Sequence, residues 1–187
     1  MTPPESGSEE GGRDGGPVGR SGPSDVVVGV DGGGSGYWLG REALRAVTRA
    51  ADGRGEATLL TSLVLEKLHL PDAQALVPWS ASATKGQVAA LAPLVIRARS
   101  RDDGVAVGMV ERGVDELRRY LEVVAGHWAP WGGVFPLAMV GGLVEEGGPL
   151  RDLAVEAVAE VGGRFRKEPV DPARGAALLA LELVSFP

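Results

Sequence analysis

The pattern of apolar and polar positions predicts helices over most of the chain. In residues 37–51 the apolar side chains lie three or four positions apart, with Ser35 placed to cap the start of a helix and Gly53 to end it. The same spacing returns in three stripes between residues 58 and 128, and the last, from Val107 to Val124, spans about five turns. We therefore expect a core built mainly from these helical faces.

Prolines mark where these helices are expected to stop or bend. The first stripe starts at Leu60 and ends before Pro71. The second stripe, residues 88–98, contains Pro93, which we expect to kink its helix because proline removes a backbone hydrogen bond.

Short apolar runs beside glycines predict strands at both ends of the helical region. Residues 26–30 form a β-branched run typical of a buried strand. Residues 135–140 form a second run that ends at Gly141 and Gly142, and a helix is expected over residues 149–161. A strand over residues 164–170 and a helix from Asp171-Pro172 complete an α/β ending, so we predict a helix-rich α/β fold.

The first 25 residues differ in composition from the rest. They hold seven Gly, four Pro and four Ser, and such a segment buries too little apolar surface to offset the entropy of ordering it. We expect residues 1–25 to be a disordered tail and residues 26–187 to form one domain.

Composition excludes several functional classes. The 187 residues include no cysteine and only two histidines, His69 and His127, which excludes thiolate zinc sites, iron–sulfur clusters and cysteine nucleophiles. The net charge of −6 argues against a nucleic-acid partner, because binding phosphates needs a clustered basic surface. No apolar run approaches the roughly 20 residues that span a bilayer, so we expect a cytoplasmic protein without a membrane partner.

Two glycine-rich turns are the candidates for chemistry. In the first, the predicted strand runs into Asp31, Gly32, Gly33, Gly34 and Ser35 before a helix; in the second, a strand runs into Gly141-Gly142. Glycines let backbone N–H groups approach a phosphate, and a helix N-terminus favours the anion. Asp31 could face Mg²⁺, which prefers carboxylate oxygens. A turn without a ligand remains the alternative for both segments.

Their spacing excludes the commonest phosphate and esterase motifs. Lys67, Lys85 and Lys167 are the only lysines, and none completes a P-loop. Tyr37 stands where a dinucleotide-binding fingerprint needs its third glycine and where an esterase elbow needs its last.

The segment around the first turn resembles a known family. Residues 28–35 (VGVDGGGS) resemble the first phosphate motif of the BadF/BadG/BcrA/BcrD-type ATPases and N-acetylglucosamine kinases, within the superfamily of actin-like ATPases and sugar kinases. Residues 35–40 (SGYWLG) resemble a separate segment, the Gly-Asp-Glu-Gly-Ser-x-Tyr-Trp start of a helix in the C-terminal half of that family. Residues 137–142, 148–150 and 169–179 resemble its adenosine-binding Gly-Gly turn, the following helix and the closing helix.

The order of these segments departs from the family pattern. In the family the first phosphate loop and the Ser-x-Tyr-Trp helix are far apart in sequence, whereas here they share Gly34 and Ser35. One interpretation joins the start of the kinase to its C-terminal half, without the second phosphate motif and the general-base aspartate. In the other register, residues 31–34 are a degenerate Gly-Asp-Glu-Gly and the chain is a C-terminal half with an unrelated leader.

The resemblance implies a C-terminal actin-like ATPase lobe, ribonuclease H-like in fold, with a short N-terminal phosphate-loop strand. It implies ATP and Mg²⁺ as cofactors and phosphoryl transfer to an amino sugar, N-acetylglucosamine above all, by a chain that lacks most of the N-terminal lobe. The resemblance implies that Asp31 binds Mg²⁺ and that Gly32, Gly33, Gly34 and Ser35 contact the phosphates. It implies that Gly141 and Gly142 contact the adenosine, and it leaves the catalytic base unknown. A non-catalytic nucleotide-binding or interaction module and a ligand-free helical scaffold remain alternatives. Loss of a lobe exposes apolar surface, so we also expect self-association.

Other residues have a structural and a functional interpretation. Trp38, Trp79, Trp128 and Trp131 could stack on a sugar, although packing is the commoner role. The two histidines are expected at helix ends, and the pairs Asp102-Asp103 and Glu145-Glu146 at helix or loop edges, where they favour the helix dipole.

Overall fold

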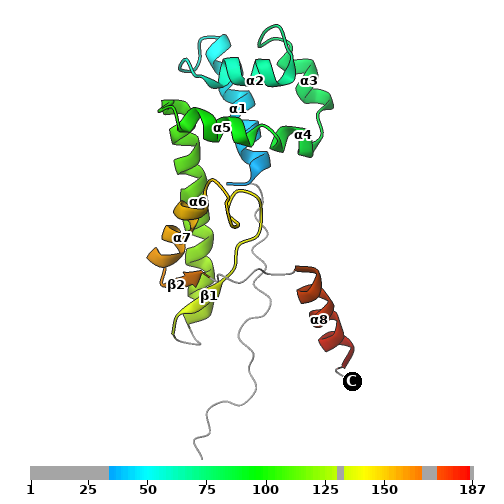
Figure 1. Ribbon diagram of the computed structural model, residues 1–187, viewed down its shortest axis with the longest axis vertical. Coiled ribbons are helices and arrows are strands. Elements are labelled where there is room, and N and C mark those ends of the chain that lie inside the picture. Colours follow the sequence, from blue (N-terminus) through cyan, green and yellow to red (C-terminus); the bar gives the residue numbers. More distant parts are fainter. Residues whose placement is uncertain (1–33, 130–132, 166–171, 186–187) are drawn as a thin grey trace, which may run out of the picture.

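The computed structural model describes residues 34–129, 133–165 and 172–185 (Figure 1). Its described elements follow the order α1 (Gly36–Ala51), α2 (Leu60–Leu68), α3 (Leu76–Ser82), α4 (Lys85–Ala89), α5 (Ala92–Arg99), α6 (Gly104–Trp128), β1 (Phe135–Leu137), α7 (Arg151–Glu160), β2 (Gly163–Phe165) and α8 (Pro172–Ser185). The predicted helix-rich character is confirmed. The expected strand over residues 26–30 and the tail of residues 1–25 lie outside the described residues.

Helix α1 begins and ends where its sequence predicts. The Oγ atom of Ser35 accepts a hydrogen bond of 3.1 Å from the Trp38 backbone N–H, which confirms the predicted N-cap. The helix ends at Asp52, and Gly53 follows with a φ of 77°, a conformation that glycine adopts without strain. One face of α1, with Leu39, Ala43 and Val47, is completely buried.

Helices α1 to α5 and the first turns of α6 surround the main hydrophobic core. Helix α1 packs against α2, α4, α5 and α6, and α5 packs against α6. Buried side chains of these helices include Leu60, Val64, Val95 and Val110, all at most 2% exposed. The stripes predicted as core faces are therefore confirmed.

The predicted kink at Pro93 is wrong. The second stripe is divided between α4 and α5, and Pro93 occupies the first turn of α5. Proline fits there because the first turn of a helix needs no backbone N–H donor.

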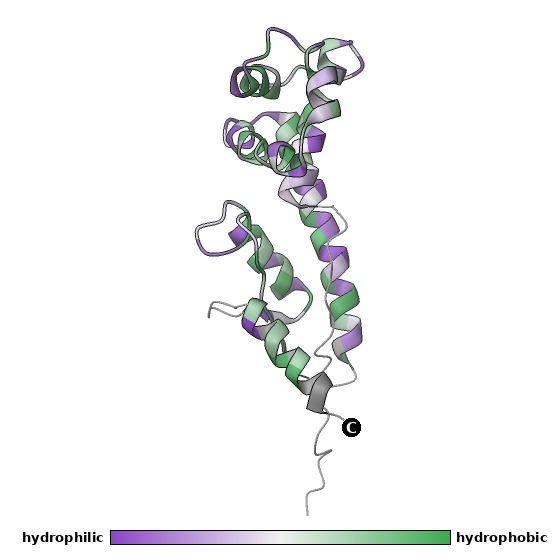
Figure 2. Cartoon of the chain, turned by 90° about the vertical axis from the view of Figure 1, so that its right-hand side faces the viewer, coloured by the Kyte–Doolittle hydropathy of each residue, from purple (hydrophilic) through white to green (hydrophobic). Residues whose placement is uncertain are grey.

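The long helix α6 is capped by Asp103, whose carboxylate accepts a hydrogen bond of 2.9 Å from the Ala106 N–H. Hydrophobic and hydrophilic colours alternate along α6 in Figure 2, as expected for a helix with one apolar face. The second half of α6 packs against α7 around a smaller core of Leu121, Ala157 and Val158.

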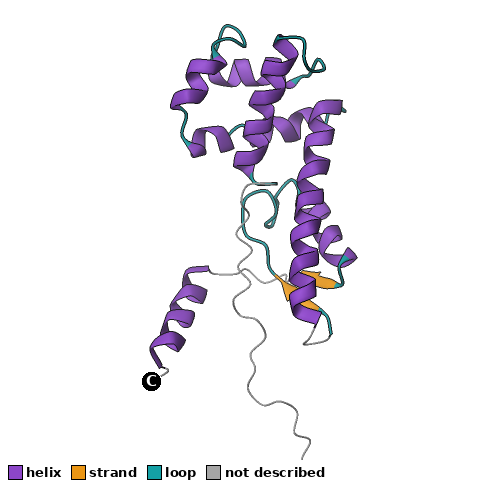
Figure 3. Cartoon of the chain, turned by 180° about the vertical axis from the view of Figure 1, so that it is seen from behind, coloured by secondary structure: helices purple, strands orange, loops and turns teal. Residues whose placement is uncertain are grey.

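Strands β1 and β2 form a two-stranded parallel sheet at one end of α6 (Figure 3). Phe135 pairs with Gly163, and a Cβ at Gly163 would lie 2.8 Å from the Phe135 ring, so only glycine permits this pairing without a shift. Helix α7 connects the strands, as a parallel pair requires. Strand β1 is shorter than the predicted run, since it ends at Leu137. Strand β2 includes Arg164 and Phe165 of the predicted second strand, and residues 166–170 lie outside the described residues.

Candidate functional site

The first glycine turn is described from Gly34 onward; Asp31, Gly32 and Gly33 lie outside the described residues. Gly34 has a φ of 79°, and a Cβ on it would lie 3.0 Å from the Gly113 carbonyl oxygen of α6. Gly113 is buried, and a Cβ on it would lie 3.3 Å from Gly34 Cα. The two glycines thus let the turn pack closely on α6.

Ser35 has a structural role in this turn. Its Oγ atom caps α1, so one lone pair of the hydroxyl is already used.

The second glycine turn starts the connection from β1 to α7. Gly141 has a φ of 133°, and its carbonyl oxygen accepts hydrogen bonds from Val144 N–H at 2.9 Å and Glu145 N–H at 3.0 Å. Leu150 N–H then donates to the Leu143 carbonyl oxygen at 2.8 Å, directly before α7. These hydrogen bonds fix the backbone of the turn.

The surface above this second turn is open. Gly141 and Gly142 are exposed; a Cβ on Gly141 would meet no atom within 4 Å, and one on Gly142 would meet only the Glu145 Oε1 atom at 4.0 Å. Missing side chains on a rigid, exposed backbone leave room for a flat group such as an adenine base.

Arg151 ties the second turn to β2 and was not singled out from the sequence. Its guanidinium lies 4.6 Å from the centroid of the Phe165 ring, and its Nη1 atom donates to the Val144 carbonyl oxygen at 3.4 Å. The only sequence signal is a cation at the first residue of the helix after a Gly-Gly turn, because Phe165 reaches it from a different element.

Both turns border the main core but are contributed by distant parts of the chain. Trp38, three residues after Ser35, and Leu143 and Val144, just after Gly142, all pack against the same buried cluster. The structure thus brings the flanks of the predicted site residues onto one core.

The remaining aromatic and histidine candidates have structural positions. Trp38 packs on the core and Trp79 is half-buried in α3; Trp131 and the side chain of Trp128 lie outside the described residues. His69 ends α2 in the left-handed conformation, with a φ of 55°. The Nδ1 atom of His127 lies 2.7 Å from the Val123 carbonyl oxygen.

The two predicted pairs of acidic residues differ in burial and in structural role. Asp103 is buried and caps α6, as expected for a dipole partner, whereas Asp102 is exposed with a φ of 58°. Glu145 and Glu146 are exposed within the second glycine turn. In the part of the chain that the structure describes, no three acidic or histidine side chains gather as a metal site, and no helix is long and apolar enough to cross a membrane.

Comparison with known proteins finds relatives of this chain in both sequence and fold. The chain is 31% identical to the N-acetyl-D-glucosamine kinase of Dictyostelium discoideum over 169 residues, which are 87% of this chain and 52% of the relative. The fold is similar to the solved structure of a proposed N-acetylglucosamine kinase from Chromobacterium violaceum, with a TM-score of 0.61, 32% identity, and coverage of 78% of this chain and 47% of that one. No protein-family model matches the chain. The resemblance to N-acetylglucosamine kinases predicted from the motifs is therefore confirmed, and the chain spans about half the length of each of these relatives.

Proposed function

We propose that the chain acts in ATP-dependent phosphorylation of an amino sugar, with N-acetylglucosamine as the substrate to test first. The observation that carries this proposal is the alignment of 87% of the chain with an N-acetyl-D-glucosamine kinase. We further propose that residues 26–187 form one C-terminal actin-like ATPase lobe that acts in the cytoplasm and self-associates.

The residues of the two glycine turns are assigned to the nucleotide. Gly141 and Gly142 would hold the adenosine, because the turn is fixed by its own hydrogen bonds and open above the backbone. Gly32, Gly33, Gly34 and Ser35 would approach the phosphates at the start of α1, and Asp31 would face Mg²⁺.

Bound ATP with Mg²⁺ supplies the phosphoryl group in such a reaction. The chain's own contribution is to position the nucleotide and the sugar, which supplies most of the rate in phosphoryl transfer. Arg151 would keep the adenosine turn against β2 through its contacts with Phe165 and the Val144 carbonyl.

A second candidate is a nucleotide-binding or interaction module without catalysis. It is supported by the coverage of about half of each relative, because sugar kinases of this superfamily bind ATP between two lobes. In that case ATP·Mg²⁺ binds and no sugar is phosphorylated.

Isothermal titration of the full chain with ATP·Mg²⁺, with and without N-acetylglucosamine, separates the two functions. Sugar-dependent formation of ADP supports the kinase and excludes the module. ATP binding without turnover of the amino sugar supports the module, and undetectable ATP binding rejects both in favour of a ligand-free scaffold.

Gly142→Val locates the nucleotide site. A Cβ on Gly142 would meet only the Glu145 Oε1 atom, at 4.0 Å, so we expect an unchanged fold while the space above the turn is filled. Loss of ATP binding with an unchanged melting temperature supports the assignment. ATP binding equal to that of the unsubstituted chain would place the nucleotide elsewhere.

A further inference from the structure

The strand pattern of residues 135–140, here called the β1 run, continues beyond the end of β1. Covered and exposed side chains alternate along it. The covered ones are Phe135, Leu137 and Met139, and the exposed ones are Pro136, Ala138 and Val140. Alternation with a period of two is typical of a strand with one covered face. The pattern therefore reaches Val140, although the pairing with β2 is described only as far as Leu137.

The edge of the β1 run that faces away from β2 has no neighbouring strand in the described part of the chain, where the sheet consists of β1 and β2. Pro136 has no N–H, and proline in a strand turns that side away from its pairing partner. Alternate residues of a strand point to the same side, so the backbone groups of Ala138 and Val140 also point away from β2. From the Pro136 carbonyl to Val140, this edge can accept another strand.

The same region exposes apolar side chains. Val134 is 57% exposed and Val140 is 59% exposed, although valine is usually buried in folded proteins. An exposed strand edge that carries apolar side chains is a template for pairing with a further strand. An apolar, β-branched segment is the partner that this edge fits best.

The chain contains such a segment just before α1. Residues 26–30, here called the N-terminal run, have the sequence Val-Val-Val-Gly-Val and lie outside the described residues. Their composition is that of a buried strand, and a strand needs a partner for its backbone hydrogen bonds.

The N-terminal run is close enough to reach the open edge. Gly34 lies against Gly113 of α6, and Leu117 and Leu121 follow on the same side of α6 because the three residues are four positions apart. The two leucines pack in the smaller core with the covered side chains Leu137 and Met139 of the β1 run. The rise along α6 from Gly113 to Leu121 is about 12 Å, and the chain from residue 34 back to residue 30 spans about 13 Å when extended.

The direction of the chain makes the two runs parallel. The β1 run starts beside the smaller core, and Leu143 and Val144, which follow it, pack on the main core. The N-terminal run likewise leads toward the main core, because it continues into Gly34 and α1. Helices α1 to α6 then supply the long connection that two parallel strands require.

We propose that the N-terminal run adds to the open edge of the β1 run as a third, parallel strand. The carboxyl ends of neighbouring parallel strands lie together, so Asp31 and the glycines after it would lie beside Gly141 and Gly142. The docking does not depend on a ligand. Its consequence, a single nucleotide site built from both glycine turns, rests on the proposed function.

A disulfide tests the docking in the full chain, which has no cysteine of its own. With the two glycine turns level, Val28 lies beside Ala138, and neighbouring strands are about 4.8 Å apart, within the range that a disulfide bridges. Under mild oxidation V28C/A138C should form an intramolecular disulfide, measured by the loss of two hydrogen atoms in the mass spectrum and by faster migration on a non-reducing gel.

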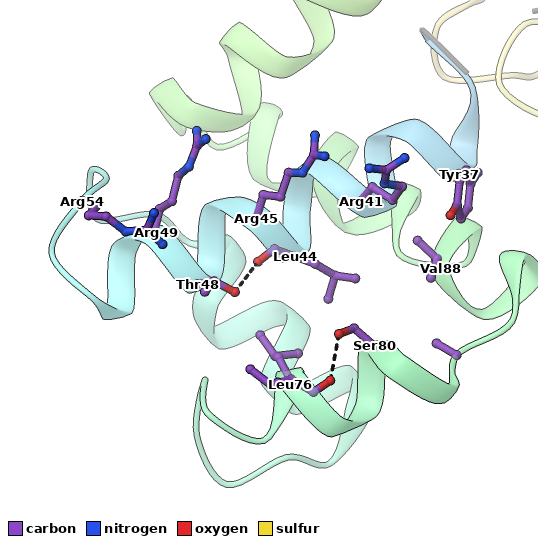
Figure 4. Close-up of a pocket in the computed structure, with 12 residues that line it drawn as sticks. Tyr37, Arg41, Leu44, Arg45, Thr48, Arg49, Arg54, Leu76, Ser80 and Val88 are labelled. Atoms are coloured by element: carbon purple, nitrogen blue, oxygen red, sulfur yellow. Dashed lines mark hydrogen bonds between the residues drawn. The ribbon is translucent and has the colours of Figure 1, made fainter. Parts of the chain in front are cut away.

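The matched control is V28C/S80C. Ser80 is exposed like Ala138, but it lies on α3 beside a cavity of about 350 Å³ between α1 and α3 (Figure 4). Figure 1 shows α3 at the opposite end of the helical part from β1. The V28C/A138C disulfide should form at least about tenfold faster, because docking raises the effective concentration of the two thiols. Equal rates would overturn the proposal, and a disulfide between two chains would assign the edge to a second copy instead.

Amide hydrogen exchange gives a second measurement. In the full chain the N–H groups of Ala138 and Val140 should exchange at least about tenfold more slowly than in V27P/V28P, where one of two adjacent prolines must face β1. The control V18P/G19P places two prolines in the leader and should leave both exchange rates unchanged. Equal exchange in the two proline variants would overturn the proposal.

Titration with ATP·Mg²⁺ separates the docking from the proposed function. Oxidised V28C/A138C should bind ATP within about twofold of its reduced form, because the disulfide holds the strand where it already lies. Loss of ATP binding on oxidation alone would overturn the single site built from both turns. Disulfide formation without ATP binding in either form would leave the docking intact and reject the proposed function.

Discussion

The Asp103 carboxylate accepts a hydrogen bond of 3.0 Å from the hydroxyl of Thr58, 45 residues earlier in the chain. The same carboxylate accepts a bond of 2.7 Å from the Leu59 N–H and caps α6 through the Ala106 N–H. One buried side chain therefore fixes the start of α2 to the start of α6.

Asp103→Ala should lower the free energy of unfolding by about 2–4 kcal/mol, because a cap is lost and several buried donors lose their acceptor. Chemical denaturation measures the change. Asp102→Asn is the control, since Asp102 is exposed and asparagine tolerates its positive φ. Equal effects of the two substitutions would show that the Asp103 network adds nothing to stability.

Gly40→Ala should destabilise the fold by about 1–3 kcal/mol, the usual effect of overpacking. A Cβ at Gly40 would lie 1.9 Å from the Val88 carbonyl oxygen, so α1 and α4 would have to separate. In α6, a Cβ at Gly126 would meet no atom within 4 Å, so Gly126→Ala should stabilise the helix by about 0.4–1 kcal/mol. Thermal unfolding of both variants gives the signs, and a neutral or stabilising Gly40→Ala would contradict this packing.

Two substitutions of Ser35 separate its cap from a phosphate contact. Ser35→Ala should cost about 1 kcal/mol through loss of the N-cap. Ser35→Asp retains a capping oxygen and should keep stability, but its negative charge should weaken ATP binding by repelling phosphate. Unchanged ATP affinity in Ser35→Asp would remove Ser35 from the proposed site while leaving its capping role intact.

The Asp52–Arg54 pair predicts a small pH effect. The hydrogen bond from Arg54 holds the pKa of the Asp52 carboxyl below its usual value of 3.8. A lowered pKa in the folded state contributes stability above the unfolded-state pKa, and this contribution is lost as pH falls through the folded value. The stability difference between the chain and Arg54→Gln should therefore be constant near neutral pH and disappear below pH 3.8.

Carboxyl chemical shifts in an NMR titration test the same pair directly. Arg54→Gln should raise the pKa of Asp52 toward its usual value, while Arg101→Gln should leave it in place. A pKa of Asp52 that does not respond to Arg54→Gln would show that the ion pair is absent in solution.

Local sequence rules predicted much of the fold. The Ser35 cap, the ends of α1 and the long helix α6 followed from caps and spacing, since these depend on residues within a few positions of each other. The predicted kink at Pro93 was wrong because proline also fits the first turn of a helix. The spacing of apolar residues alone does not show where one helix ends and the next begins.

The candidate site was predicted in part. The second glycine turn and the resemblance to N-acetylglucosamine kinases were evident from the motifs. The contact of Arg151 with the Phe165 ring was not predicted, because that ring belongs to the next strand.

By itself, the sequence determined α1 with its Ser35 cap, the long helix α6, the positions of the glycine turns and the family resemblance, all of which are local patterns. Only the tertiary structure decided that Asp103 reaches Thr58, that Gly40 lies against Val88, and that the arginines of α1 line a cavity with α3. The physical reason is that packing joins residues from separate elements, and the spacing within each element contains no information about which faces meet.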